Sequence, residues 1–230
     1  MQVVYEDNHI IVVNKAPGEI VQGDKTGDEP LSETLKRWLK EKYNKPGNVF
    51  LGVVHRLDRP VGGLVVFAKT SKALARLNEM FRNGEVHKTY WALSRNLPKE
   101  PSGELHGFIR TIEKSNKSLY YPEPREGAKE ARLRYRTLAS LDHYNLIEVE
   151  LLTGRKHQIR VQLASIGCPI KGDLKYGDRR SNPDGSISLI ARHIEFVHPV
   201  SKELLSLTAP VAKDALWQAA EAAVSSNETI

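Results

Sequence analysis

The sequence predicts an α+β fold with a largely antiparallel sheet. Short runs rich in β-branched residues recur along the 230-residue chain, while only a few scattered stretches show the apolar repeat of an amphipathic helix. The regular alternation of strand and helix that marks a doubly wound parallel sheet is missing. A composition of 40% hydrophobic and 27% charged residues is that of a globular chain with a real core, and we expect a single domain over residues 1–230.

The predicted strands lie between turn residues. The opening run predicts a hairpin around Asp7-Asn8 that closes at Pro17-Gly18. Residues 63–70 form a continuous apolar run, which is typical of a strand buried on both faces. Further strands are predicted at residues 85–95, 131–138, 145–153, 193–199 and 204–210, and the last two should pair as a hairpin.

Four segments show a helical pattern. Residues 30–43 place apolar side chains on one stripe, and residues 71–84 follow with Ser71 as the expected N-cap and Gly84 as the closing residue. A third helix is predicted over residues 153–167, entered at Thr153-Gly154, and a terminal one over residues 214–223. The polar stretch at residues 101–130 should form strands joined by loops.

Charge and cysteine content limit the possible functions. Lysine and arginine outnumber aspartate and glutamate by 34 to 28, and the resulting net charge of +6 favours an anionic partner such as nucleic acid. A single cysteine, Cys168, excludes an intrachain disulfide framework and a cysteine-based zinc cluster. The sequence shows neither a signal peptide nor an apolar run that could span a membrane, so we expect no membrane association and a cytoplasmic location.

Several common chemistries lack their motifs. The chain has no G-x-S-x-G, G-x-G-x-x-G or G-x-x-x-x-G-K-[ST] sequence, which argues against a serine hydrolase, a dinucleotide enzyme and a P-loop ATPase. His193 and His198 are five residues apart in a strand pattern, so they should face opposite ways and make a poor metal pair. Cys168 is interpreted as structural.

Two clusters of polar residues could carry chemistry. On the predicted helix at 153–167, Lys156, His157 and Arg160 should share one face, with Arg155 in a first turn that favours anions. A solvated basic face explains this pattern equally well. In the strand at 85–95, Lys88 and Tyr90 should point to the same side, where the tyrosine could stack on a base or move a proton. The alternative is a core tyrosine beside a snorkelling lysine.

Taken together, three segments resemble the RluA-type RNA pseudouridine synthases. They are HRLDRPVGGLVVFAKT (55–70), VHKTYWAL (86–93) and LLTGRKHQIRVQLASIGCPIKGDLKYG (151–177). The resemblance implies a pseudouridine synthase fold: a long mixed, mostly antiparallel sheet in two halves, flanked by helices and loops, with an active-site cleft between the halves. It also implies isomerisation of particular uridines in structured RNA, ribosomal or transfer RNA, without a cofactor or a metal.

The resemblance also suggests roles for individual residues. Asp58 matches the catalytic aspartate, Tyr90 the tyrosine that stacks on the target base, and Arg160 the basic residue paired with that aspartate. Arg56 matches an arginine that fills the space left by a flipped base. We expect RNA contacts from Arg56, Arg59, Lys88, Arg155, Lys156 and His157, and target recognition from the basic region at 101–136, since no separate N-terminal RNA-binding domain is expected.

Elementary chemistry agrees with these roles. Isomerisation breaks the N1–C1′ bond, turns the uracil and rejoins it through C5, and water is a hazard because it would leave an abasic site. One carboxylate therefore suffices, whereas a glycosidase needs a second one to activate water. Arg160 would keep Asp58 ionised and oriented, and the glycines after Asp58 would let the backbone approach the substrate.

Two alternatives stay open. The chain could be a non-catalytic RNA-binding protein that keeps the fold, although such a protein has no need of a carboxylate close to RNA. It could also be a nucleoside N-glycoside hydrolase, against which the missing second carboxylate counts. Relatives often carry Thr-Ser-Gly at Val61-Gly62-Gly63 and a histidine at Gln162, so no subfamily is assigned. We expect a monomer with no obligatory protein partner.

Overall fold

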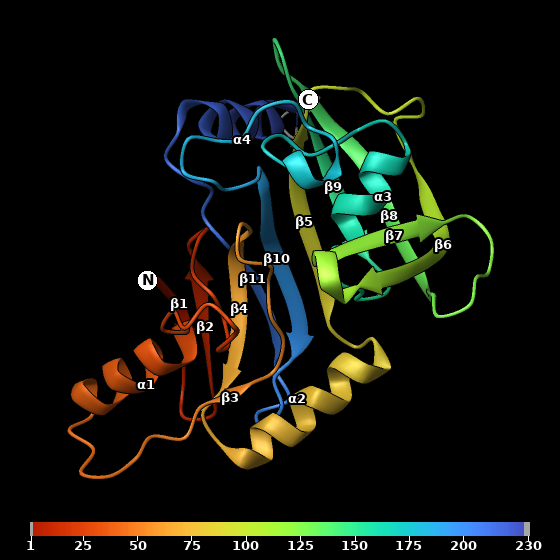
Figure 1. Ribbon diagram of the computed structural model, residues 1–230. Helices are drawn as coiled ribbons and strands as arrows, with labels where there is room; N and C mark the ends of the chain where they lie inside the picture. The colour runs from red at the N-terminus through yellow and green to blue at the C-terminus, as the bar shows by residue number, and fades with distance from the viewer. Residues whose placement is uncertain (1, 228–230) are drawn as a thin grey trace. The chain divides into compact units, whose positions relative to one another are not determined.

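The computed structural model describes residues 2–227 and has the predicted α+β class (Figure 1). It divides into two compact units. Unit 1 comprises Met1–His87 and His193–Pro210, and unit 2 comprises Lys88–Arg192 and Val211–Ile230. The chain passes between them three times, twice within a strand, at His87-Lys88 in β5 and at Arg192-His193 in β10. A single domain over residues 1–230 stays a prediction.

Unit 1 contains two sets of antiparallel strands and two helices. One set has the order β1-β2-β4, with β3 also pairing with β4, and the other is the hairpin β10-β11. The bounds are β1 Gln2–Glu6, β2 Ile10–Lys15, β3 Gly52–Val53, β4 Gly62–Ala68, β10 Leu189–Val197 (its first four residues in unit 2), β11 Leu204–Thr208, α1 Leu31–Lys42 and α2 Ser71–Asn83. Both predicted hairpins are confirmed.

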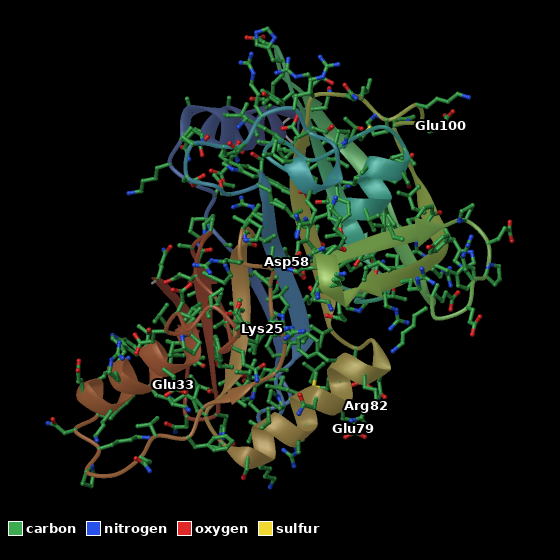
Figure 2. All side chains as sticks on the ribbon, in the orientation of Figure 1. Lys25, Glu33, Asp58, Glu79, Arg82 and Glu100 are labelled. Carbon is green, nitrogen blue, oxygen red and sulfur yellow. The ribbon has the colours of Figure 1, made fainter. Side chains whose placement is uncertain are left out.

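The strand predicted at 63–70 is confirmed as the centre of unit 1. Every residue of β4 is buried, and Val65, Val66 and Phe67 are fully shielded from solvent. β2 lies beside it with Ile10 to Val13 equally buried. Helix α2 packs against β3 and β4 and covers part of this core. The charged residues Glu79 and Arg82 of α2 are exposed (Figure 2).

The N-cap of α2 corrects one prediction. Thr70, not Ser71, is the cap: it is extended, and its hydroxyl accepts a hydrogen bond from the Ala73 N–H at 3.1 Å. The two residues carry the same side-chain chemistry, so the sequence pattern could not place the helix start to one residue. Gly84 closes the helix in the left-handed conformation, as predicted.

Unit 2 is built on one antiparallel array in the order β5-β9-β8-β6-β7. Its elements are β5 His87–Ser94, β6 Ser102–Ile112, β7 Lys117–Tyr121, β8 Lys129–Ser140, β9 Asn145–Leu151, α3 Gln158–Ser165 and α4 Ala215–Asn227, with short 3₁₀ turns η1 Glu113–Ser115 and η2 Leu174–Tyr176. Gly107 of β6 is needed for the hairpin with β7, because a Cβ there would lie 2.4 Å from the Tyr120 ring.

The terminal helix α4 begins where the sequence predicts it. The Asp214 carboxylate accepts hydrogen bonds from the N–H groups of Leu216 and Trp217, both at 3.1 Å, and α4 contacts β8. No helix within residues 2–227 has the length and apolar character needed to cross a membrane.

A buried carboxylate ties the first strand to the helix and strand that follow. The Glu6 side chain is 8% exposed and accepts from Lys42 Nζ at 2.5 Å, Lys69 Nζ at 2.7 Å and the Tyr43 hydroxyl at 2.8 Å. Burial by itself raises the pKa of Glu6, but these three donors outweigh it and lower the pKa to about 2.

Glu6 should therefore make the stability depend on pH between about 4.5 and 2. The folded pKa lies below the unfolded value, so the unfolded chain binds more protons in this window and stability falls as the pH falls through it. We expect Glu6→Gln to be less stable than the wild type at pH 7 and to lose less stability between pH 4.5 and 2. Urea unfolding at a series of pH values measures this. Glu33→Gln, at an exposed ion pair, is the control, and equal slopes for all three proteins would contradict the assignment.

Candidate active site

The proposed catalytic residues are divided between the units. Asp58 lies in unit 1, and Tyr90 and Arg160 lie in unit 2. The predicted pairing of Asp58 with Arg160 joins different units and stays a prediction. Each unit does show how its own candidates are positioned.

Asp58 stands in a tight turn between β3 and β4 (Figure 2). The Asp58 carbonyl accepts from the Val61 N–H at 3.0 Å, and the Arg59 carbonyl accepts from the Gly18 N–H at 2.8 Å. Leu57 is buried while Asp58 is only partly buried. The turn is therefore held through its backbone on both sides of Asp58.

Lys15 lies beneath this turn. Its side chain is 1% exposed, and its ammonium donates to the carbonyls of Ala16 at 2.9 Å and Arg59 at 3.2 Å. Burial lowers the pKa of Lys15 to about 8, and the charges of Glu19 and Asp58 oppose that shift. A buried ammonium thus holds the backbone beside Asp58 and adds positive charge near the carboxylate.

The first residue of the H-R-L-D segment has a packing role. His55 Nε2 accepts from the Val66 N–H at 3.0 Å, and its ring stacks on Phe81 of α2 with the centroids 4.8 Å apart. An acceptor at Nε2 fixes the neutral Nδ1–H tautomer for this contact. His55 therefore attaches the start of the segment to β4 and α2.

The paired glycines serve contacts inside unit 1. A Cβ on Gly62 would lie 3.3 Å from both the Lys15 carbonyl oxygen and the Pro17 ring, and Gly63 has a φ of 113° that L side chains rarely adopt. These constraints let β4 run close to the end of β2 directly after the Asp58 turn. A role in admitting substrate remains a prediction.

Tyr90 and Lys88 occupy the start of β5. Tyr90 is 7% exposed, and Lys88 is largely buried. Burial lowers the pKa of Lys88, which weakens its hold on a proton relative to a surface lysine. Trp91, which follows Tyr90, faces Arg192 at 4.4 Å from its ring centroid. The strand thus presents Tyr90 from a rigid, packed element.

The helix predicted at 153–167 starts later than expected. The prediction that Lys156, His157 and Arg160 share one helical face is therefore wrong, because Lys156 and His157 precede the helix. α3 begins at Gln158, and His157 precedes it in the left-handed conformation with a φ of 54°. The Gln158 side chain explains the break, because its Oε1 accepts from the Thr153 hydroxyl at 2.8 Å and from the Arg155 N–H at 3.0 Å. Arg155 therefore does not lie in a helical first turn.

Arg160 is held in a buried ion pair. Its Nε and Nη2 donate to the two carboxylate oxygens of Asp173 at 2.7 and 2.9 Å, and the two side chains are 6% and 1% exposed. The ring centroid of Tyr176 lies 5.0 Å from the guanidinium carbon. A guanidinium has five N–H donors, so the bidentate contact does not exhaust Arg160.

The predicted RNA-binding residues have varied surroundings. Arg56 is exposed, and exposed Arg59 pairs with Asp28 at 2.6 Å. Lys156 lies 3.5 Å from Glu113, and Arg155 Nε donates to the Glu130 carbonyl at 2.7 Å. By contrast His157 is only 7% exposed, and its Nδ1 shares a 2.7 Å hydrogen bond with the Tyr176 hydroxyl.

The basic region at 101–136 is less cationic than its sequence suggests. Arg132 contacts Glu104 at 2.7 Å, and Arg136 contacts Glu148 at 2.6 Å. Arg134 lies 3.4 Å from the same Glu104. The exposed arginines of β8 are therefore largely neutralised, and RNA recognition by this region stays a prediction that rests more on the hairpin β6–β7.

The remaining candidates carry no chemistry of their own. Cys168 is fully buried, and burial raises the pKa of its thiol, as expected of a structural cysteine. His193 hydrogen-bonds Thr208, whereas buried His198 contacts Asp7 at 2.9 Å. Among residues 2–227 no group of three or more histidine, cysteine, aspartate or glutamate side chains is arranged to hold a metal ion.

Sequence reasoning missed four residues that shape the candidate site: Lys15, His55, Asp173 and Tyr176. His55, Asp173 and Tyr176 lie inside the segments that carry the resemblance, and Lys15 lies at the end of the opening hairpin. Asp173 alone offered a signal, since a charged residue between glycine and an apolar residue in a loop can be a buried partner. Its partner is 13 residues away, and no local pattern identifies it.

Comparison with known proteins gives a consistent picture. Residues 9–165 match the family described as RNA pseudouridylate synthase. The chain is 36% identical over 194 residues to the mitochondrial pseudouridylate synthase RPUSD4 of Xenopus tropicalis, covering 76% of this chain and 60% of that protein. It is 32% identical to ribosomal large subunit pseudouridine synthase C of Vibrio cholerae, covering 91% and 65%.

A shorter relative and a solved structure extend the comparison. The tRNA pseudouridine synthase C of Vibrio vulnificus is 30% identical, with 95% of this chain and 93% of that protein covered. The structure of human RNA pseudouridylate synthase domain containing 4 superposes with a TM-score of 0.78 at 24% identity, covering 97% of this chain and 93% of that one. This likeness shows the same fold.

Removing the partner of Arg160 should strongly destabilise the protein. Asp173→Asn keeps the shape but leaves a buried guanidinium without its counter-charge, and we expect a loss of about 3–5 kcal/mol in the free energy of unfolding. Urea denaturation measures the change. Glu104→Gln, which removes a carboxylate from exposed arginines in the same unit, is the control and should change stability little. Equal effects of the two substitutions would contradict a special role for the buried pair.

Proposed function

The chain belongs to the RNA pseudouridylate synthase family, and we propose that it isomerises specific uridines in structured RNA to pseudouridine. The observation that carries this proposal is the family match over residues 9–165, which includes Asp58, Tyr90 and Arg160. The chain spans 60–65% of the length of the first three curated relatives that it matches. The activity of those whole proteins is therefore extended to this chain as a proposal.

The proposed reaction needs one carboxylate and no external reactant. The N1–C1′ bond breaks, the uracil turns within the site, C5 bonds to C1′, and the C5 proton is lost while N1 gains one. Asp58 acts on the nucleotide, whether by adding to sugar or base or by abstracting a sugar proton. Tyr90 stacks on the uracil and assists removal of the C5 proton, and Arg160 keeps Asp58 ionised and oriented.

The surroundings of these residues support such roles. Lys15 and Gly18 hold the backbone of the Asp58 turn, and β5 presents Tyr90 from a packed strand. Rigid supports of this kind are what positioning of a reacting group requires. Flipping the uridine out of its stack costs a few kcal/mol, which stacking on Tyr90 and phosphate contacts would offset.

A nucleoside hydrolase is less well supported. It needs a second carboxylate to activate water. Asp173 is the carboxylate next to Arg160, but it is 1% exposed and both of its oxygens accept from the guanidinium. That geometry suits a structural partner and not a base that meets water.

The substrate class is structured RNA, either ribosomal or transfer RNA. The relatives carry names of both kinds, ribosomal large subunit and tRNA pseudouridine synthases. Arg56, Arg59, Lys88, Arg155, Lys156 and His157 are the proposed RNA contacts. We still expect a cytoplasmic monomer with no obligatory protein partner, cofactor or metal. Light scattering measures the oligomeric state, cell fractionation the location, and an activity assay in the presence of a chelator the need for a metal.

Replacing Asp58 should abolish turnover without abolishing binding. Asp58→Asn keeps the size of the side chain but replaces the charged carboxylate with a neutral amide. We expect no detectable pseudouridine in transcribed ribosomal or transfer RNA under single-turnover conditions, with an RNA dissociation constant within about threefold of wild type.

Asp24→Asn is the matched control, since it makes the same chemical change at an exposed turn of the same unit, and it should react at the wild-type rate. Loss of affinity and activity together in Asp58→Asn would mark Asp58 as structural. Release of free uracil by the wild type would favour the hydrolase.

A further inference from the structure

Tyr176 lies where three parts of unit 2 meet. Its hydroxyl accepts from the Ser118 N–H of β7 at 2.7 Å and shares the hydrogen bond with His157 Nδ1 just before α3. Its ring lies against the Arg160 guanidinium. The hydroxyl is thus shared by the hairpin and by His157, the residue just before α3. Burial raises the pKa of Tyr176, so the hydroxyl stays protonated at neutral pH.

Further contacts hold the hairpin β6–β7 to the same place. The Ser118 hydroxyl donates to the Lys156 carbonyl at 2.7 Å, and Lys175 Nζ donates to the Asn116 carbonyl at 2.9 Å. Ser118 is 1% exposed, so its bond forms away from solvent, whereas the bond of Lys175 is exposed. The turn of the hairpin is therefore fixed to residues on both sides of Arg160 in the sequence.

The hairpin also has an outward side that RNA can reach. Lys114 and Lys117 are exposed on either side of Asn116, and Leu119 is 40% exposed. Two cations beside a tight turn suit the phosphates of a folded RNA. RNA bound on this side would contact the same hairpin, β6–β7, that is hydrogen-bonded to Tyr176.

We infer that Tyr176 is a positioning residue that couples the hairpin β6–β7 to the Arg160 guanidinium. The Asp173 carboxylate fixes two donors of Arg160 in one plane, and the Tyr176 ring restricts rotation of that plane. The Tyr176 hydroxyl in turn fixes the ring, because it bonds the hairpin and His157. The inference rests on the proposed function in that Arg160 is taken as the counter-ion of Asp58.

The test compares two tyrosines on neighbouring contacts. Tyr176→Phe removes the hydroxyl and keeps the ring. Tyr120→Phe makes the same change on β7, where the hydroxyl donates to the His106 carbonyl at 2.8 Å away from Arg160. At saturating RNA we expect Tyr176→Phe to slow pseudouridine formation about 10-fold, because it loses the hydrogen bonds of the hydroxyl with Ser118 and His157, with RNA affinity unchanged. Tyr120→Phe should react at the wild-type rate.

A second variant and a spectroscopic measurement complete the test. Ser118→Ala removes the bond to Lys156 with little change in volume, and it should reduce the rate in the same way by a smaller factor. In ¹⁵N-labelled protein, the Arg160 Nε–H signal should exchange with water faster in Tyr176→Phe than in the wild type or in Tyr120→Phe.

The inference is overturned if Tyr176→Phe reacts like the wild type, if both phenylalanine variants lose rate equally, or if the Arg160 signal exchanges equally in all proteins. A wild type without activity on any RNA would instead remove the proposed function. The exchange measurement would then still decide whether Tyr176 positions Arg160.

Discussion

The buried pair of Arg160 and Asp173 is the interaction on which the candidate site of unit 2 depends. Two charges are taken out of water, and the bidentate geometry is what makes that burial tolerable. A buried ion pair contributes little net stability compared with an apolar pair of the same size, but it permits only one arrangement. Its value here is the fixed orientation of a guanidinium that the proposed reaction uses.

In unit 1, Asp58 is positioned by the backbone hydrogen bonds of its turn. The turn around Asp58 is fixed by the carbonyls of Asp58 and Arg59, which accept from the N–H groups of Val61 and Gly18. Lys15 adds a buried ammonium below the turn, and Gly62 lets β4 pass close to Lys15 and Pro17. The Asp58 turn is thus built on a strand whose residues are all buried, which gives a loop residue the support of the core.

Strand positions were predictable because burial imposes a local pattern. β4, the two unit 1 hairpins and the last helix follow from runs of apolar residues and turn residues. The start of α3 was not predictable, because the Gln158 side chain competes with the helix for the backbone at Arg155 and puts His157 in a left-handed conformation. The helical pattern of apolar residues extends back to Thr153 in the sequence and gives no sign of this break.

Some residues of the candidate site could likewise be predicted from the sequence, and others could not. Asp58, Tyr90 and Arg160 could be named from the resemblance, since motifs preserve the residues that meet the substrate. Asp173 and Tyr176 act through contacts 13 to 58 residues apart in the chain, and such contacts leave no local periodicity. They are identified only when the fold brings η2, β7 and α3 together.

The most direct measurement of the central claim is a map of pseudouridine in total RNA. Four samples would be compared. They are cells that naturally make the protein, cells from which its gene is deleted, and deletion cells that express either the wild type or Asp58→Asn. The account predicts that at least one pseudouridine disappears with the protein, returns with the wild type and stays absent with Asp58→Asn. An unchanged set of pseudouridines in all four would contradict it.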